Sequence, residues 1–346
     1  MQGADLLYLA RDPGLGVRPM RRREFITLLG GVAVAAWPLA ARAQQTVPVI
    51  GFLHPGSLGE RIHLLAGLRE GLRARGYLEG QNVTIEYRWA DDQFDRLPAL
   101  AAELVRRRVS VIAAPAGTVA ALAAKSATTT IPIIFGSEHD PVKAGLVASF
   151  NRPEGNATGV YFLSGGLAEK RLGLIRELLP RADLIGLLLN PDDPLTDVIT
   201  TEVHQAASTV GQRIEVLHAS SSREIDAAFA SLLQKRAGAF VLGPGALFFS
   251  RRVQLVTLAT RHGIPAIYVS REFVQAGGLM SYGTNLVEMW RQVGDYVGRV
   301  LKGTNPTDLP VIQSTKLEFV INVQTARTFD LEIPPSLLAR ADEVIE

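Results

Sequence analysis

Three ionisable side chains in a row, Glu138, His139 and Asp140, follow the apolar run IPIIF at 131–135. Two carboxylates beside an imidazole have the residue types for general acid–base chemistry or for binding a metal ion. Adjacent side chains in a loop generally diverge, however, and no HxxxH or similar ligand spacing occurs in the chain. We therefore interpret the stretch as a binding loop without a catalytic residue, a metal or a cofactor.

Asp140 has two roles open to it in that loop. Pro141 suits the first position of a helix, which would make Asp140 the N-cap residue. The alternative is that Ser137 and Asp140 face a ligand, with Asp140 pairing with a cationic amine. The choice depends on where the fold places the loop.

The rest of the mature chain alternates short apolar runs with amphipathic helical stretches. Runs rich in Val and Ile that are separated by helical patterns are typical of parallel strands buried on both faces. We predict strands at 47–53, 82–89, 109–114, 131–135 and 156–162, and a second series at 184–190, 213–219, 238–243, 265–269 and 278–283.

Five strand–helix repeats followed by five more predict an α/β fold with two doubly wound parallel-sheet lobes joined by a hinge. We place the first crossing at 156–161, the second at 281–285 and the third at 305–313. Lobe 1 then comprises residues 44–158 and 284–309, and lobe 2 comprises residues 159–283 and 310–346. Ligands bind such sheets at the carboxyl ends of the strands.

The first 43 residues have the pattern of an export signal. Three arginines (21–23) precede the apolar stretch ITLLGGVAVAAWPLA, and ARA (41–43) supplies a small-residue cleavage site. The arginine pair followed by Phe25 resembles a twin-arginine signal. A membrane anchor is less favoured, because the stretch is shorter than the ~20 residues of a span. We expect a periplasmic protein, with residues 1–19 as an over-called start before Met20.

The composition excludes several classes of protein. The chain of 346 residues has no cysteine, which rules out disulfides, a thiolate nucleophile and a cysteine-linked lipid anchor. Of its 36 basic and 34 acidic residues, six arginines and three acids lie in residues 1–43, which leaves 30 and 31 and a net charge of −1. That balance gives no reason to expect a nucleic-acid partner.

Five stretches along the chain are recognisable: VIGFLHPGS, LREGLRARGYLEGQNVTIEYRWADDQFDRLPALAAELV, ATTTIPIIFGSEHDPVKAGLVASFNRPEGNATGV, REFVQAGGLMSYG and PPSLLARADEVIE. They resemble the ABC-transporter substrate-binding proteins of the tryptophan/tyrosine-type family. The resemblance covers essentially everything after the signal. It implies the type I periplasmic-binding fold, a small-molecule ligand and ABC permease membrane subunits as partners. We expect a monomer.

One strand-end loop has the features of an anion site. The loop PAGT (115–118) leads into a helix, and the free N–H groups and dipole of a helix N-terminus favour a carboxylate. We predict that Gly117 and Thr118 bind a carboxylate of the ligand. The alternative is that Thr118 only caps the helix.

Other strand ends carry a serine, an amide and a carboxylate in a proline-rich turn, several aromatic rings and a glutamate. Each has a structural alternative, since the serine can cap a helix, the turn can be structural, the rings can belong to the core and the glutamate can be solvated. The candidate ligand-binding residues are Ser57, Gly117, Thr118, Ser137, Asp140, Phe162, Asn190, Asp193, Phe248, Tyr268 and Glu272.

The leading hypothesis is the periplasmic solute-binding component of an ABC importer. It binds a small molecule, such as an aromatic or branched amino acid or a related carboxylate, between two lobes and delivers it to a membrane permease. A sensory receptor of the same fold is the first alternative. A periplasmic hydrolase that uses Glu138, His139 and Asp140 is less favoured, because no nucleophile motif accompanies these residues.

Overall fold

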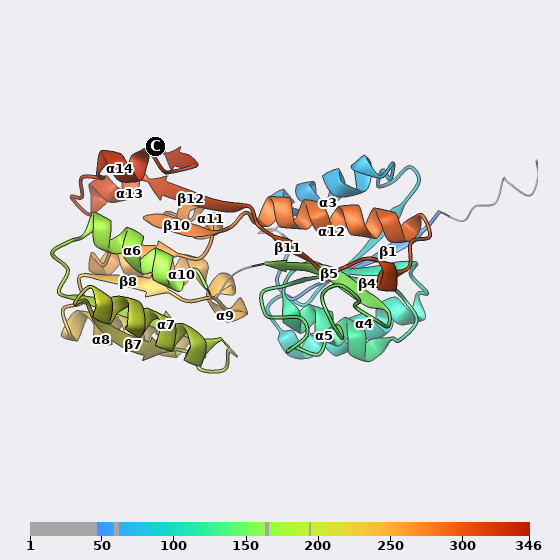
Figure 1. The fold of residues 1–346 in the computed structure, drawn as a ribbon, viewed down its shortest axis with the longest axis horizontal. Coiled ribbons are helices and arrows are strands. Elements are labelled where there is room, and N and C mark those ends of the chain that lie inside the picture. The colour runs from blue at the N-terminus through green and yellow to red at the C-terminus, as the bar shows by residue number, and fades with distance from the viewer. Residues whose placement is uncertain (1–46, 59–61, 163–165, 194) are drawn as a thin grey trace, which may run out of the picture. The chain divides into compact units, whose positions relative to one another are not determined.

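Two β-sheets organise the chain, and each is covered by helices on both faces (Figure 1). The computed structural model describes residues 47–58, 62–162, 166–193 and 195–346, and the export signal predicted for residues 1–43 lies outside them. We call the six-stranded sheet with its helices lobe 1, and the seven-stranded sheet with its helices lobe 2.

The sheet of lobe 1 is parallel throughout. Its strand order is β11-β5-β4-β3-β1-β2, and every neighbouring pair runs in the same direction. The strands are β1 (Val49–His54), β2 (Thr84–Trp89), β3 (Val111–Ala114), β4 (Ile133–Ser137), β5 (Ala157–Phe162) and β11 (Ile312–Ser314).

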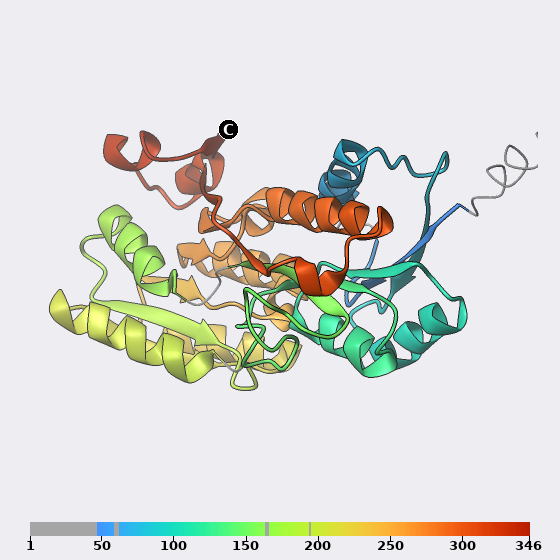
Figure 2. The ribbon, with the colours of Figure 1, turned by 45° about the vertical axis from the view of Figure 1, so that its right-hand side comes forward.

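Four helices bury the two faces of this sheet. Helices α3 (Ile62–Ala74) and α12 (Leu286–Leu301) cover one face, and Figures 1 and 2 show them side by side. Helices α4 (Leu97–Arg106) and α5 (Thr118–Ala127) cover the other face. The short 3₁₀ turns η1 (Phe94–Arg96) and η2 (Pro306–Asp308) connect strands and helices.

The sheet of lobe 2 has the strand order β13-β12-β10-β9-β8-β6-β7. All neighbouring pairs are parallel except β10 and β12, which are antiparallel. The strands are β6 (Leu184–Leu189), β7 (Arg213–His218), β8 (Ala239–Leu242), β9 (Ala266–Tyr268), β10 (Met280–Thr284), β12 (Leu317–Asn322) and β13 (Glu343–Ile345).

Helices cover both faces of this second sheet as well. Helices α6 (Ala168–Leu178), α7 (Thr196–Thr209), α13 (Val323–Thr328) and α14 (Pro335–Leu338) pack on one face. Helices α8 (Ser222–Gln234), α9 (Ala246–Ser250), α10 (Arg252–His262) and α11 (Arg271–Gln275) pack on the other. None of the helices that the structure describes is both long and apolar enough to cross a membrane. The predicted class of two doubly wound α/β lobes is confirmed.

Two of the predicted lobe boundaries are wrong. Strand β5 pairs with β4 in lobe 1 from Ala157 to Tyr161 and with β11 at Phe162, so the first crossing follows Phe162 and not residue 158. Strand β11 pairs with β5, so the third crossing follows Ser314 and not residue 309. The second boundary agrees to within a residue, because β10 ends at Thr284 and α12 begins at Leu286.

The second and third crossings are hydrogen-bonded to each other. The N–H of Asn285 donates to the carbonyl of Lys316 at 2.9 Å. The Asn285 side chain caps α12 by accepting from the N–H of Glu288 at 2.8 Å, and it donates to Glu318 in β12 at 2.8 Å. Burial raises the pKa of Glu318, although the nearby Arg271 lowers it in part.

Helices α3 and α12 approach each other through glycines. A Cβ atom added at Gly71 would lie 2.0 Å from the carbonyl oxygen of Arg291, and one added at Gly294 would lie 2.1 Å from the carbonyl oxygen of Leu68. These distances are shorter than any non-bonded contact that backbone atoms tolerate. Glycine is therefore required wherever the two helix backbones meet.

We predict that Gly294→Ala lowers the free energy of unfolding by about 1–3 kcal/mol or more, because the added methyl group forces α3 and α12 apart. Urea unfolding followed by circular dichroism measures the change. Gly173→Ala in α6 is the matched control, since a Cβ there meets nothing within 4 Å. That variant should gain about 0.4–1 kcal/mol. Equal effects of the two substitutions would contradict the close-packing account.

Candidate functional site

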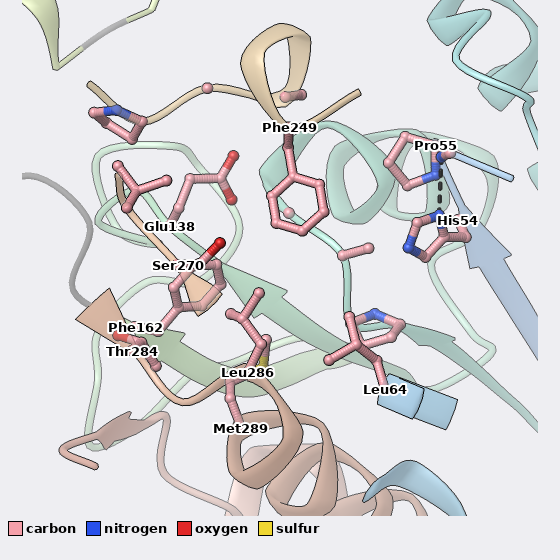
Figure 3. A pocket seen from close by; sticks show the side chains of 18 of the residues that line it. His54, Pro55, Leu64, Glu138, Phe162, Phe249, Ser270, Thr284, Leu286 and Met289 are labelled. Atoms are coloured by element: carbon pink, nitrogen blue, oxygen red, sulfur yellow. Dashed lines mark hydrogen bonds between the residues drawn. The ribbon is translucent and has the colours of Figure 1, made fainter. Parts of the chain in front are cut away.

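A pocket lies where the carboxyl ends of strands from both lobes meet (Figure 3). Lobe 1 contributes the loops after β1, β2, β3 and β4, the end of β5 and the first turns of α12. Lobe 2 contributes the loop after β8 with α9, the residues after β9 and the end of β10. The pocket has a volume of about 880 Å³, counting the open space at its mouth. Its position is the one that doubly wound sheets use for ligands.

Aromatic side chains from both lobes form much of the pocket wall. Phe162 ends β5, Trp290 lies near the start of α12, and Phe249 belongs to α9 of lobe 2. Figure 3 shows the Phe249 ring pointing into the pocket. Leu286 and Met289 from α12 add aliphatic surface. Such a wall favours a ligand with a flat apolar part.

His54, at the end of β1, is one of the residues that line the pocket. Its ring is 1% exposed and packs at 4.7 Å from the Trp89 ring and 5.7 Å from the Trp290 ring, between centroids. Its Nδ1 accepts a hydrogen bond from the N–H of Gly56 at 2.8 Å. A neutral ring therefore carries its proton on Nε2.

The carboxylate of Glu138 occupies the N-terminus of α5. Its Oε2 accepts from the N–H of Thr118 at 2.9 Å and from the Thr118 hydroxyl at 3.2 Å. The same carboxylate lies 3.1 Å from where a Cβ of Gly117 would be, and Gly117 has a φ of +102°. Figure 3 shows Glu138 among the side chains that line the pocket. The anion position predicted for the ligand is thus filled by a carboxylate of the protein itself.

His139 lies between Glu138 and a carboxylate of lobe 2. Its Nε2 is 3.2 Å from Oδ1 of Asp193, and its Nδ1 is 2.9 Å from the Thr118 hydroxyl and 3.6 Å from Oε1 of Glu138. Burial lowers the pKa of His139, but the hydrogen bond to Asp193 and the charges of Glu138 and Asp193 outweigh it, so the pKa lies above 6.5. The expectation that the side chains of Glu138 and His139 diverge is wrong, because Thr118 holds both of them.

The structure brings some of the predicted residues to the pocket. Gly117 and Phe162 line it directly. Thr118, Ser137 and Asp193 do not line the pocket but are bonded to residues of the Glu138–His139 loop. Ser137 is fully buried, and its hydroxyl donates to the carbonyl of His139 at 2.7 Å.

Other predicted residues are not among those that line the pocket. Asp140 accepts from the N–H groups of Val142 and Lys143 at 2.8 and 3.1 Å, so it caps a turn. Phe248 and Tyr268 are buried in the core of lobe 2. The three that remain are a part-exposed serine, a turn asparagine and a buried glutamate that pairs with His63, namely Ser57, Asn190 and Glu272.

Several residues of the pocket were missed from the sequence. Phe249 lines it where Phe248 was predicted, because neighbouring residues of α9 point about 100° apart and one of them must face the core. Trp290 and Met289 belong to the helix that follows a crossing, so their nearness to the crossing was the available signal. His54 ends the first strand, where any side chain faces the pocket edge.

No group of three or more His, Asp or Glu side chains within the described ranges is arranged to hold a metal ion.

The comparison with known families and proteins gives consistent results. The model of a family described as ABC transporter substrate binding protein matches residues 47–345. The tyrosine-binding protein of Clostridioides difficile (strain R20291) is 28% identical over 267 residues, which are 77% of this chain and 76% of that protein.

Two solved structures are similar with a TM-score of 0.77. One is a conserved domain protein of Vibrio cholerae O1 biovar El Tor, which is 27% identical and whose match covers 86% of this chain and all of that one. The other is the ABC domain from Streptococcus pneumoniae in complex with L-Trp, which is 25% identical, with 87% of this chain and all of that one covered.

We predict that Asp140→Ala lowers the free energy of unfolding by about 1 kcal/mol, because two backbone N–H groups lose their acceptor. Asp140→Asn keeps an acceptor oxygen and should cost less. Chemical unfolding of both variants measures the difference. The selectivity of ligand binding should be unchanged in both, and a selective loss of cationic ligands in Asp140→Ala would place Asp140 in the site after all.

Proposed function

Because this chain belongs to the ABC transporter substrate-binding protein family and has the type I periplasmic-binding fold, we propose that it is a solute receptor of an ABC importer. It binds a small molecule between its lobes and delivers it unaltered to a membrane permease. Export by the twin-arginine-like signal to the periplasm is part of the same proposal. The observation that carries it is a pocket lined by both lobes, so that a ligand in contact with both favours their closure.

We propose an aromatic amino acid, or a close relative of one, as the ligand. The rings of Phe162, Phe249 and Trp290 offer apolar surface for a flat side chain. An aromatic side chain buries roughly 150–250 Å², which makes it the main source of binding free energy. Two relatives support this class of ligand, since one is named a tyrosine-binding protein and the other was solved with L-Trp.

The polar groups of the pocket divide between the lobes. Glu138 of lobe 1 is positioned to accept a hydrogen bond from the ammonium group of the ligand. Thr284 of lobe 2 lines the pocket with a hydroxyl group, a type of group that can donate to a carboxylate, whereas the Ser270 hydroxyl is directed at Glu272. The ligand carboxylate is therefore assigned to lobe 2, away from the α5 N-terminus that Glu138 already fills.

The proposal predicts that some members of a panel of small molecules bind tightly and are recovered unchanged. The panel holds tryptophan, tyrosine, phenylalanine and leucine, together with the corresponding amines that lack the carboxylate and acids that lack the amine. A ligand present at 100 times its Kd should stabilise the protein by about 2.7 kcal/mol. Calorimetry and thermal shift measure binding, and chromatography measures recovery. Consumption of a ligand, or no binding across the panel, would overturn the proposal.

Glu138→Gln tests the assignment of the ammonium group. Glutamine keeps an oxygen that can accept from the N–H of Thr118, so the start of α5 should stay intact. A hydrogen bond to a charged group contributes about 1.5–3 kcal/mol, so affinity for amine-bearing ligands should fall roughly 10- to 100-fold. Acids without the amine should be affected less. Asp140→Asn is the control, and an equal loss for both ligand classes would contradict the assignment.

A further inference from the structure

The side chain of His139 connects the two lobes beside the pocket. It follows β4 of lobe 1, whereas Asp193 follows β6 of lobe 2, and the ring nitrogen Nε2 lies 3.2 Å from Oδ1 of Asp193. Both side chains are largely buried, at 15% and 9% exposure. Because the partners belong to different lobes, any hinge opening that separates the lobes breaks this contact.

The hydrogen-bond partners of His139 fit a protonated ring. Nε2 faces a carboxylate that only accepts, because Oδ1 of Asp193 already accepts from the N–H of Leu195 at 2.9 Å. Nδ1 faces the Thr118 hydroxyl, whose single proton goes to Oγ of Ser137 at 2.8 Å or to Oε2 of Glu138 at 3.2 Å, because the Ser137 proton is donated to the carbonyl of His139. Both ring nitrogens therefore face acceptors, and two N–H groups satisfy them.

A neutral ring satisfies fewer of these partners. With its proton on Nδ1, the lone pair of Nε2 would face the Asp193 carboxylate. With its proton on Nε2, the bond to Asp193 remains but the ring is uncharged, and the Thr118 hydroxyl would have to turn toward Nδ1 and leave its acceptor, Ser137 or Glu138. The first arrangement loses the bond to Asp193 and the second loses its charge assistance, so deprotonation weakens the contact between the lobes.

We propose that His139 makes ligand capture pH-dependent: closure of the lobes on a ligand brings His139 against Asp193 and takes up a proton. The proposal rests on the proposed function, since it describes the regulation of the same site. The charged groups that face the ring are Glu138 from its own loop and Asp193 from the loop after β6, while α5 presents the neutral Thr118.

The direction of the effect follows from the raised pKa of His139, which burial opposes and the carboxylates of Asp193 and Glu138 produce. With the lobes apart, His139 loses the hydrogen bond and the charge of Asp193, so we expect its pKa to be lower in the open form than in the closed form. The extra stabilisation of the closed form is then complete below the pKa of the open form and is lost as the pH rises through the raised pKa of the closed form. Proton uptake is largest between these two values.

An ammonium group bound at Glu138 repels a protonated His139 and so lowers its pKa, but we still expect His139 to take up a proton on closure. The imidazolium bonds directly to Asp193 through Nε2 at 3.2 Å, whereas an ammonium group bound at Glu138 would reach the ring only through the Glu138 carboxylate, which lies 3.6 Å from Nδ1. With His139 protonated, Glu138, His139 and Asp193 together carry a net charge of −1, so the site still attracts a cation.

A second contact between the lobes also joins a histidine of lobe 1 to a carboxylate of lobe 2. Nε2 of His63 in α3 lies 3.2 Å from Oε1 of Glu272 in α11. Burial raises the pKa of Glu272, but hydrogen bonds from His63 and Ser270 outweigh it, so the carboxyl group is ionised at neutral pH. His63 is more exposed, at 38%, so this contact should contribute less than the one of His139 to holding the lobes together.

The test is calorimetric titration with the tightest ligand of the panel, between about pH 6 and pH 8, in buffers of different ionisation enthalpy. The wild type should take up a substantial fraction of one proton near neutral pH, and its Kd should rise about three- to tenfold over this range. His139→Gln keeps a donor toward Asp193 but does not titrate, so its proton uptake and pH dependence should largely disappear. His204→Gln, at an exposed position of α7, should behave as the wild type.

A second measurement reports on His139 itself. Proton NMR titration of its ring, identified by its absence in His139→Gln, should give a higher pKa with ligand than without. Asp193→Asn, which can still accept from the N–H of Leu195, should remove that difference. Binding without proton uptake and with equal pKa values in both states would overturn the inference and leave the proposed function standing. Absence of binding across the panel would overturn both.

Discussion

The carboxylate of Glu138 on the N-terminus of α5 determines the chemistry of the pocket. The first free N–H groups of a helix attract an anion, and here the protein supplies that anion through the Thr118 N–H and hydroxyl. Gly117 has no side chain, and this leaves room for the carboxylate at 3.1 Å. The same hydroxyl of Thr118 contacts His139 and so fixes the ring that reaches lobe 2. One interaction thus sets the pocket wall and the contact between the lobes.

The helix α12 couples the pocket to the crossings between the lobes. It begins directly after β10, its N-cap Asn285 is bonded to the neighbouring crossing, and its first turns supply Leu286 and Trp290 to the pocket. The rest of α12 is packed against α3 through glycines, which leaves the helix little freedom to shift within lobe 1. A ligand that touches α12 therefore contacts an element that starts at the hinge and is rigid beyond it.

The strands that carry the fold could be predicted because parallel strands buried on both faces need continuous apolar runs, such as the LIGLLL of β6. Strand β11 could not, since IQS is too short and too polar to show a pattern, and its pairing with β5 is long-range. The third lobe boundary failed for the same reason, whereas the first failed because the predicted strand at 156–162 gave no sign that it pairs with β4. The sequence pattern can place a residue at the end of a strand. Whether that residue faces the pocket depends on the register of the strand and on the strands that it pairs with.

The loop of Glu138, His139 and Asp140 shows this limit most clearly. Its place at the end of β4 followed from the pattern of strands, and the cap role of Asp140 was one of two roles open from its proline neighbour. What the sequence did not show was that Thr118, 20 residues before Glu138, contacts this loop: its backbone N–H holds Glu138 at the pocket, and its hydroxyl contacts the His139 ring that reaches lobe 2. Tertiary contacts of this kind leave no local signature.

In the mechanism that we propose, the contacts between the lobes tune closure and do not drive it. A solvent-exposed ion pair contributes about 0–1 kcal/mol, and a partly buried one contributes somewhat more. Micromolar binding corresponds to about 8 kcal/mol, most of which must come from apolar surface buried against rings such as Phe249 and Trp290. If the histidine contacts were the larger contribution, the lobes would close without a ligand and the receptor could not report its presence. The contact between His139 and Asp193 is weak, and its strength depends on one proton. It can therefore shift the affinity for the ligand with pH while the ligand remains the cause of closure.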